Sequence, residues 1–177
     1  LNDINYPFLK HDFLQLLENT SCVGAKTGWI PLHVTVSNGN SLIAGMPLYL
    51  KSHSQGEFVF DHSWANAFYQ HGLDYYPKLV SSIPHTPASG PRLLIKEGEN
   101  KKELFEMIKE GVRNIAAKNN ISSWHILFPR EEEVHFYDDS NLSIRKNAQF
   151  IWFNENFETF EDCLLYTSDA ADERSSV

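Results

Sequence analysis

The sequence predicts an α/β protein of the α+β type, in which helices flank a mixed sheet, and three observations lead to this class. The first is a β-hairpin: apolar residues alternate over 30–36, Asn38 and Gly39 supply a turn, and a second apolar run covers 42–50. The second is an amphipathic helix that begins near residue 101. The third is a set of short apolar segments typical of strands, at 78–83, 92–95, 122–129 and 144–153.

Local signals in the first 60 residues add to this layout. A helix is expected after Pro7, because apolar side chains recur at helical spacing up to the polar stretch 19–21. Pro47 interrupts the second strand of the hairpin, and since proline has no N–H to donate, it predicts an edge position or a bulge. The stretch 57–60 is then expected to extend the sheet.

The next helix is predicted to start at Asp61, an acceptor suited to capping, and to end before Gly72. Its apolar side is expected to carry Trp64, Ala65 and Phe68.

Three further features concern the second half of the chain. Asn100 with Glu103 forms a capping box for the long helix. His125, in an apolar run, is expected to be a hydrogen-bonded core histidine. The acidic stretch 131–133 is predicted to be the solvated first turn of a helix, where negative charge suits the helix dipole.

Composition limits the class of protein. With 177 residues, 42% of them hydrophobic, the chain can bury one core, so a single domain over 1–162 is expected. The formal net charge of −8 argues against nucleic-acid binding through bulk charge. Two distant cysteines favour a reducing compartment, and no apolar run or leader pattern predicts a membrane span or a signal peptide. The sequence therefore predicts a cytoplasmic protein.

The main candidate site lies between the hairpin and the helix at 61. Lys51, His53, Glu57 and Asp61 are the candidate catalytic residues, because connections between elements often carry function. In this interpretation Lys51 or His53 holds an anionic or carbonyl group, while Glu57 or Asp61 accepts a proton or orients an amine. The structural alternative is a polar connection in which Asp61 only caps the helix.

Further residues are predicted to line the same groove and to bind substrate: Trp64, Tyr69, Tyr75, Tyr76, Lys78, Thr86 and Arg92. Arg92 follows a Pro- and Gly-rich loop and is a fork-shaped donor suited to a carboxylate or phosphate. The structural alternatives are half-buried aromatic rings with hydrated hydroxyls and a turn with a surface arginine.

No metal site is predicted. His53, His62 and His71 lie nine residues apart, which matches neither one helix face nor one strand face, and the usual zinc spacings are missing. The sequence also has no phosphate-binding glycine loop and no serine-nucleophile motif. A solvated helix with histidines at its two ends is the expected arrangement.

Five blocks, taken in order, resemble the bacterial FemAB-like proteins, described as peptidoglycan biosynthesis or recognition proteins and as predicted N-acyltransferases of the GNAT superfamily. The blocks are TGWIPLH (27–33), PLYLKSHSQGEFVFDHSWANAF (47–68), YYPKL (75–79), TPASGPRLL (86–94) and SSWHILFP (122–129). His85 departs from this pattern, in which an aromatic residue is expected at that position.

The resemblance implies two GNAT-like domains, of which this chain holds the first, so a C-terminal GNAT-like domain is missing. It implies transfer of an activated acyl or aminoacyl group to a small-molecule or peptide amine, with acyl-CoA or aminoacyl-tRNA as the donor in the full protein. No cofactor is expected to be bound by this chain alone, because no glycine-rich pyrophosphate loop precedes the helix at residue 101. The alternative function is a non-catalytic module that recognises a cell-wall peptide or sugar.

The last fifteen residues, 163–177, fit none of these elements. They resemble the translation of sequencing-adapter DNA, and the expectation is that this tail is not native.

Overall fold

The computed structural model describes residues 6–146, 153–154 and 156–164. The chain forms two units, the first ending at Ile144 and the second beginning at Arg145. In the second unit, a helical turn over 160–164 begins with a reciprocal cap, since the backbone N–H groups of Thr159 and Asp162 each donate to the other's side chain. Most of the tail predicted to be non-native, 163–177, lies outside the described residues. The fold of the first unit confirms the mixed α/β class.

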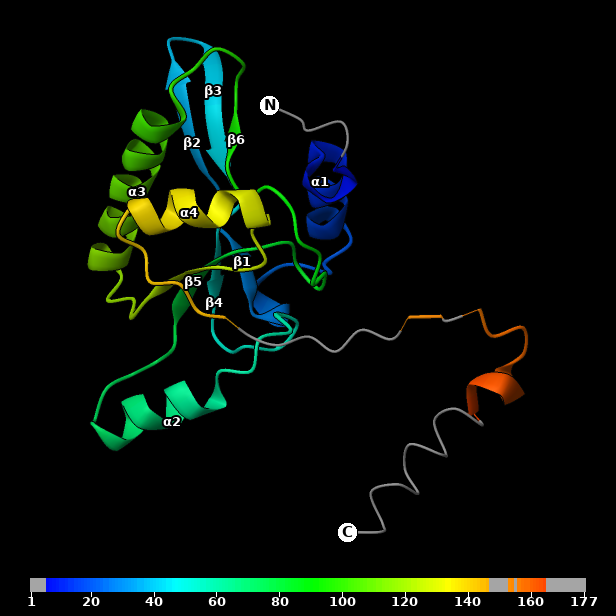
Figure 1. The fold of residues 1–177 in the computed structure, drawn as a ribbon. Coiled ribbons are helices and arrows are strands. Elements are labelled where there is room, and N and C mark those ends of the chain that lie inside the picture. Colours follow the sequence, from blue (N-terminus) through cyan, green and yellow to red (C-terminus); the bar gives the residue numbers. More distant parts are fainter. Residues whose placement is uncertain (1–5, 147–152, 155, 165–177) are drawn as a thin grey trace. The chain divides into compact units, whose positions relative to one another are not determined.

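Helices and strands follow one another along the first unit (Figure 1). The helices are α1 (His11–Asn19), α2 (His62–Gln70), α3 (Lys101–Lys118) and α4 (Glu131–Asp139), with 3₁₀ turns η1 (Pro7–Leu9) and η2 (Ala25–Thr27). The strands are β1 (Trp29–Pro31), β2 (Val34–Asn38), β3 (Ser41–Met46), β4 (Tyr49–Lys51), β5 (Lys78–Ser81), β6 (Leu94–Ile95) and β7 (Trp124–Ile126). Among the described residues, no helix combines the length and apolar character needed to cross a membrane.

The strands form two sheets, ordered β1-β4-β5-β7 and β2-β3-β6. All pairs are antiparallel except β5 with β7. The predicted hairpin is present, but each of its two long strands is divided in two. Pro31 and Pro47 explain the division, because neither can donate a ladder hydrogen bond in this region.

The divided hairpin nevertheless keeps one register. Pro31 pairs with Tyr49, Val34 pairs with Met46, and between them Leu32 N donates to Leu48 O at 2.8 Å. The two sheets are therefore joined by one hairpin, whose halves are the pair β2–β3 and the pair β1–β4. The β2–β3 half ends in the tight turn at Gly39, and the β1–β4 half leads into the polar segment 52–61.

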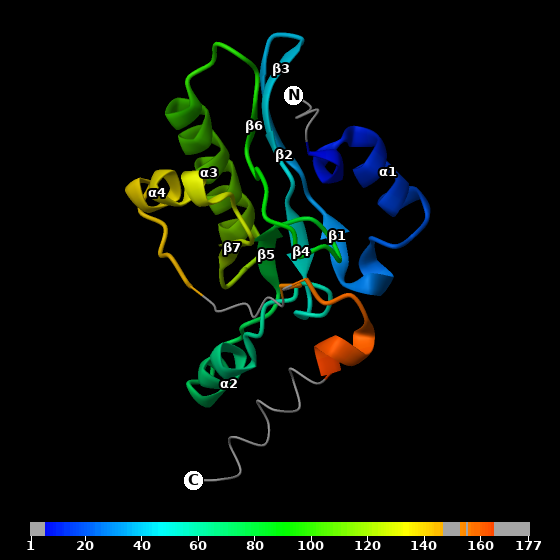
Figure 2. The same ribbon diagram turned by 45° about the vertical axis from the view of Figure 1, so that its right-hand side comes forward.

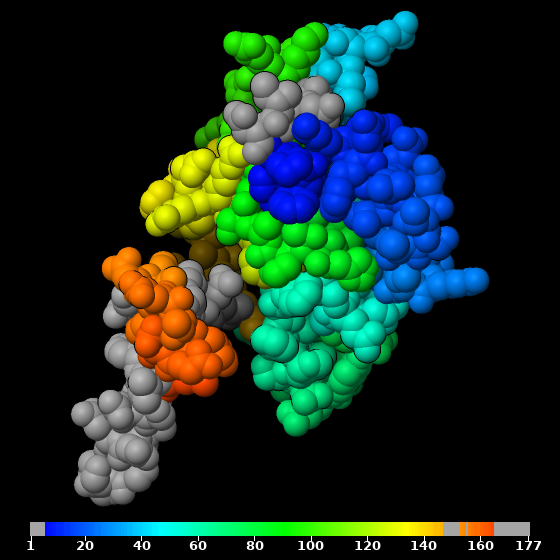
Figure 3. All heavy atoms as spheres, turned by 90° about the vertical axis from the view of Figure 1, so that its right-hand side faces the viewer, coloured from blue at the N-terminus to red at the C-terminus, as the bar shows by residue number. Residues whose placement is uncertain are grey.

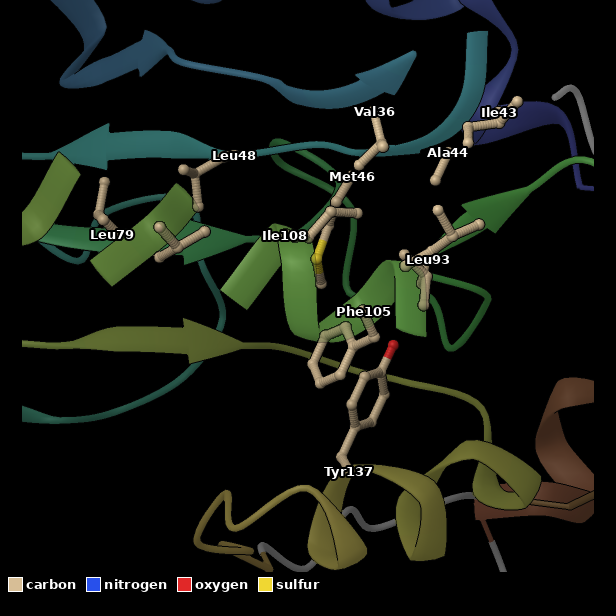
Figure 4. Close-up of a cluster of buried hydrophobic side chains, with 12 residues drawn as sticks. Val36, Ile43, Ala44, Met46, Leu48, Leu79, Leu93, Phe105, Ile108 and Tyr137 are labelled. Atoms are coloured by element: carbon tan, nitrogen blue, oxygen red, sulfur yellow. The ribbon is translucent and has the colours of Figure 1, made fainter. Parts of the chain in front are cut away.

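Helix α3 supplies much of the core. Asn100 accepts hydrogen bonds from the backbone of Lys102 and Glu103, so the Asn100 half of the predicted capping box is confirmed. One face of the helix packs on strands and on α4, with Phe105 against Tyr137 at a ring separation of 5.3 Å (Figure 4). Fully burying a side chain of this size stabilises the fold by about 1.5–3 kcal/mol.

The remaining helices surround this core. Helices α3 and α1 lie on opposite sides of the strands in both ribbon views, and α2 lies beyond the β4–β5 end, away from the β2–β3 turn (Figures 1 and 2). The acidic stretch 131–133 begins α4 as predicted, although Glu133 is buried instead of solvated. His125 shares a hydrogen bond with Ser123 at 2.8 Å as expected, but it lies half-buried on β7 instead of in the core.

Several local predictions are wrong. The stretch 57–60 has no regular secondary structure, and Phe58 adopts a φ of 57°, outside the range of a strand. Asp61 occupies the N-cap position of α2, but its side chain makes no capping bond. Trp64 is 53% exposed, whereas Ala65 on the same helix is buried. A strand was predicted at 144–153, but residues 144–146 do not belong to a strand. Most of the remaining residues of this stretch lie outside the described residues.

Candidate functional site

Three neighbouring strands, β1, β4 and β5, bring the first residues of the candidate site together. On β1, β4 and β5, Trp29 pairs with Lys51, and Lys51 pairs with Lys78. Cross-strand partners project from the same face of a sheet, so this register brings an indole and two lysines together. All three side chains are buried, with Lys51 at 0% and Lys78 at 1% exposure. Two ammonium groups removed from water need counter-charges nearby.

The segment 52–61 supplies those counter-charges. Lys78 Nζ donates to Glu57 Oε2 at 2.7 Å, to Asp61 Oδ2 at 2.5 Å and to Ser54 Oγ at 3.1 Å. These three acceptors match the three hydrogens of the ammonium group. Glu57 and Asp61 are themselves 1% exposed, so this is a closed ion-pair network. Removing one partner of such a network typically costs about 3–5 kcal/mol.

Asp61 is held ionised by its neighbours. Tyr75 donates to Asp61 Oδ2 at 2.8 Å, and Tyr76 donates to Oδ1 at 3.5 Å. Burial raises the pKa of Asp61, but the hydrogen bond from Lys78, with those from Ser54 and Tyr75, outweighs burial and lowers it to about 2. Asp61 is consequently a fixed negative charge and a poor proton acceptor near neutral pH.

Lys51 has a different environment. Its Nζ lies 3.8 Å from the centre of the Trp29 ring and donates to Gln55 O at 3.0 Å. Burial lowers the pKa of Lys51 to about 8, with Glu57 opposing the shift and Lys78 adding to it. Lys51 can therefore lose its proton close to physiological pH.

Only one of the two carboxylate oxygens of Glu57 has a hydrogen-bond partner among the described residues. Its Oε2 accepts from Lys78, whereas its Oε1 is buried without a hydrogen-bond partner among the described residues. Burial raises the pKa of Glu57, although the positive charge of Lys78 works against the shift. Of the two carboxylates, Glu57 is thus the one with a free oxygen and the greater affinity for a proton.

His53 lies at the edge of this cluster and is half-buried. Its Nδ1 accepts from Gln55 N at 3.3 Å, so the neutral ring carries its proton on Nε2. Burial lowers the pKa of His53, and the charge of Lys51 lowers it further. The ring packs onto Gly28, where an added Cβ would collide with Nε2. Gly28 also has a φ of 69°, so both its conformation and its close contact favour glycine.

The remaining predicted residues do not all join the cluster. Tyr75 and Tyr76 join it, but Trp64 and Tyr69 are more than half exposed on α2. Thr86 is half-buried in its loop and donates to Pro84 O at 3.1 Å.

Arg92 is completely buried, and its hydrogen bonds go to neutral oxygens. It donates to the backbone carbonyls of Leu127, Pro91 and Ala88 and to the Tyr6 hydroxyl. In this arrangement the guanidinium ties the loop before β6 to the C-terminal end of β7. Binding an anion through Arg92 would require these bonds to be exchanged.

Sequence reasoning missed two members of the cluster, Trp29 and Ser54. The signal for Trp29 was the hairpin register, which places it directly opposite Lys51. Ser54 had no such signal, because its bond to Lys78 and its 2.6 Å hydrogen bond with Tyr76 join segments more than twenty residues apart.

The cluster is closed over by its own segment. On the face shown in Figure 3, the segment leading into α2 lies directly against the loop that precedes β6. A shallow depression exists at the other end of the first unit, between the β2–β3 turn and the start of α3, and it includes none of the predicted site residues. Within the described part of the chain, no three His, Cys, Asp or Glu residues gather as metal ligands would. His62 and His71 lie exposed at the two ends of α2.

Comparison with known proteins identifies one family. The family described as FemAB-like, peptidoglycan biosynthesis/recognition, matches residues 1–174. No curated protein matches the chain, and no solved structure matches it. The matched range includes the interrupted hairpin, the buried cluster and the core helix α3.

Proposed function

Because the chain belongs to the FemAB-like family of peptidoglycan biosynthesis and recognition, we propose that it serves the transfer of an activated acyl or aminoacyl group to an amine, with the segment 51–61 on the acceptor side. The observation that carries the proposal is the cluster itself. Two lysines and two carboxylates converge in it, and several of their pKa values are displaced. Displaced pKa values gather at functional sites more often than elsewhere, which supports the assignment.

In this proposal the half-buried His53 and, after an opening movement, the buried Glu57 touch substrate, and the other buried residues of the cluster position them. His53 is the group at the edge. With Nδ1 engaged by Gln55 N, its Nε2–H acts as a neutral donor toward the acyl carbonyl oxygen, where negative charge develops during attack by the amine. Lys51, behind it, helps to keep the imidazole neutral, because its positive charge lowers the pKa of His53.

As the new C–N bond forms, the bond from the acyl carbon to the donor's sulfur or ester oxygen breaks, and the departing thiol or hydroxyl finally carries away the proton that the amine loses. Until then the proton released by the attacking amine needs an acceptor. Glu57 suits this role better than Asp61, since one of its oxygens is unengaged and its pKa is raised, while the pKa of Asp61 lies at about 2. Glu57 is 1% exposed, so the proposal includes an opening movement of the 52–57 turn when substrate binds. Asp61 and Lys78 stay paired and hold the start of α2 in place.

Two parts of the proposal rest on the family resemblance: a second GNAT-like domain that supplies the donor site, and a donor that is acyl-CoA or aminoacyl-tRNA. A cytoplasmic place of action is proposed on other grounds, because the two distant cysteines favour a reducing compartment. Trp64, Tyr69, Tyr76, Thr86 and Arg92 are included as candidates for binding the acceptor. Of these, Trp64, Tyr69, Tyr76 and Thr86 have exposed or half-buried side chains in the structure, so they can meet a ligand without rearrangement.

The test is acceptor-dependent turnover by the full protein, measured with acyl-CoA and with aminoacyl-tRNA as donors and amines from cell-wall precursors as acceptors. His53→Ala should lower kcat about 10²–10³-fold, the usual loss when one donor to a developing oxyanion is removed. His62→Ala, at an exposed histidine nine residues away, is the matched control and should keep the parent rate. Equal rates for both variants, with folding verified by circular dichroism, would remove His53 from the mechanism.

The pH profile tests whether His53 is neutral under working conditions. Because the pKa of His53 lies below its ordinary value of 6.5, its imidazole is neutral above that pH, and His53 should impose no rising limb on the rate between pH 6.5 and about pH 8. A rising limb in that range that disappears in His53→Ala would show that the ring is still protonated there and would contradict its role as a neutral donor.

A second candidate function is non-catalytic recognition of a cell-wall peptide or sugar. The observation that favours it is α2, where Trp64 and Tyr69 are more than half exposed on a helix without Asp, Glu, Lys or Arg. Uncharged aromatic surfaces suit stacking on sugar rings and peptide side chains. Saturable binding of soluble peptidoglycan fragments, lost in Trp64→Ala and unaccompanied by turnover with either donor, would select this function.

A further inference from the structure

The indole of Trp29 and the carboxylate of Glu57 each leave one buried atom without a partner. Trp29 is 0% exposed and its Nε1–H makes no hydrogen bond among the described residues, and the same is true of Glu57 Oε1. An unsatisfied buried polar atom costs about 1–3 kcal/mol, and native proteins leave few of them. The two atoms differ in kind: one is a donor and the other an acceptor.

Both side chains border the same turn, 55–57. A Cβ built on Gly56 would lie 3.1 Å from Trp29 Nε1, and Gly56 directly precedes Glu57. Lys51 joins them there, with its Nζ above the Trp29 ring at 3.8 Å and bonded to Gln55 O. Lys51 has three hydrogens, of which Gln55 O accepts one and the indole face attracts the group as a whole.

The structure assigns this place to one internal water molecule, which accepts from Trp29 Nε1 and donates to Glu57 Oε1. The chemistry of the two atoms selects the ligand. A metal cation or ammonium ion has no lone pair to accept from the indole, and Lys51 repels it. An anion without hydrogens has nothing to donate to Glu57, whose charge opposes it. A neutral group that both accepts and donates satisfies both atoms, and buried waters typically make about three such bonds.

The water has a consequence for the cluster. Among the described residues, no direct hydrogen bond joins Lys51 or Trp29 to the Lys78 network, and the water links the two parts through Glu57. Lys51 can donate to the remaining lone pair of the water, which then has three partners. The two lysines thereby belong to one hydrogen-bonded network, with the water as its exchangeable member. This inference does not depend on the proposed function, because it follows from hydrogen-bond satisfaction alone.

Water–protein cross-relaxation in nuclear magnetic resonance tests it on the ¹⁵N-labelled chain. The Trp29 Nε1–H should show a direct cross-peak with water, with the sign that is characteristic of a long-lived bound water. The side chain of Trp29 is 0% exposed, so bulk solvent does not account for such a cross-peak. Trp124 supplies the internal reference, since its half-buried Nε1–H donates to Ser81 Oγ at 3.0 Å, so any cross-peak there is relayed through the exchanging Ser81 hydroxyl proton and should be weaker than that of Trp29. Trp29→Phe and Trp124→Phe assign the two signals.

A crystal structure at about 1.5 Å resolution gives the second readout. Density for a water within about 2.7–3.2 Å of both Trp29 Nε1 and Glu57 Oε1 is expected. A direct bond between these two atoms, or an indole N–H without a water cross-peak, would overturn the assignment.

Discussion

At the scale of single residues, the cluster shows how two lysines in one ladder acquire different chemistry. Lys51 and Lys78 are cross-strand partners, and both are buried. Lys78 places all three hydrogens on acceptors that include two carboxylates. Lys51 has one backbone carbonyl and an aromatic face. Burial penalises the charged form of an amine, and only close negative charge offsets this penalty fully.

We therefore expect Lys51 to titrate close to pH 8 in the folded protein. The Lys51 side-chain resonance in a ¹³C-lysine sample should move with a midpoint near this value, and Lys51→Met identifies the resonance by its loss. Because the folded pKa is below the unfolded value of 10.5, the folded protein binds fewer protons between these two pH values. The free energy of unfolding should accordingly rise with pH across that window, and Lys51→Met should lack this rise. A midpoint near 10.5 would show that Lys51 is not desolvated.

Residue-scale reasoning from the sequence recognised the right polar residues but not their partners. It named Lys51, Glu57 and Asp61 as catalytic candidates and placed Lys78 among the substrate-binding ones, without pairing any of them. Asp61 was expected to cap α2, which is a local preference worth about 1 kcal/mol. A buried ammonium without a carboxylate costs more than a lost cap, so Asp61 turns to Lys78.

At the scale of elements, two prolines shape the hairpin. The sequence indicated alternating strands and a turn at Gly39, and both are present. The edge position or bulge expected at Pro47 was wrong: Pro47 separates β3 from β4, which are both inner strands, and the register shift of the hairpin lies at Val36–Ser37. The sequence did not indicate two sheets, because that outcome depends on Pro31 lying close to the level of Pro47 in the ladder. Only the register reveals this coincidence, and register is a property of the pair rather than of either strand.

Two glycines provide an element-scale prediction. A Cβ on Gly90 would collide with the ring of Tyr6, which is buried and donates to Ala88 O. Gly90→Ala should therefore lower the free energy of unfolding by about 1–3 kcal/mol through overpacking.

Gly111 is the matched control for this substitution. It lies within α3, where an added Cβ meets only Val34 at an ordinary 3.6 Å. Gly111→Ala should raise the free energy of unfolding by about 0.5–1 kcal/mol, because alanine loses less backbone entropy in a helix. Urea denaturation of both variants checks the pair, and a stable Gly90→Ala protein would mean that Tyr6 does not pack on this backbone.

At the scale of the whole first unit, the features that could not be predicted from the sequence are those that depend on contacts between residues far apart in the chain. The mixed α/β class, the helices at α1, α2, α3 and α4 and the strands at 78–83 and 122–129 followed from periodicity and caps. Trp29 and Ser54 escaped notice because each meets the cluster across more than twenty residues of chain. The exposed position of Trp64 was missed for the related reason that α2 lies beyond the β4–β5 end and packs little of its surface.

The whole-molecule arrangement also defines what the proposed function requires. A charge-balanced cluster lies beneath a half-buried histidine, and the segment that covers it must open before Glu57 can meet an amine. The exposed aromatic residues of α2 lie on the same connection, since this helix follows Asp61 directly. The stretch 51–70 thus carries both the proposed chemistry and the alternative binding surface.

The central claim is that the segment 51–61 folds inward and seals Lys51 and Lys78 from water. Amine-reactive labelling of the native protein, read residue by residue by mass spectrometry, tests it most directly. Lys51 and Lys78 should remain unlabelled while exposed lysines such as Lys26 and Lys118 react, and both should become reactive after denaturation in urea. Labelling of Lys51 and Lys78 in the native protein at the rate of Lys26 would contradict the account.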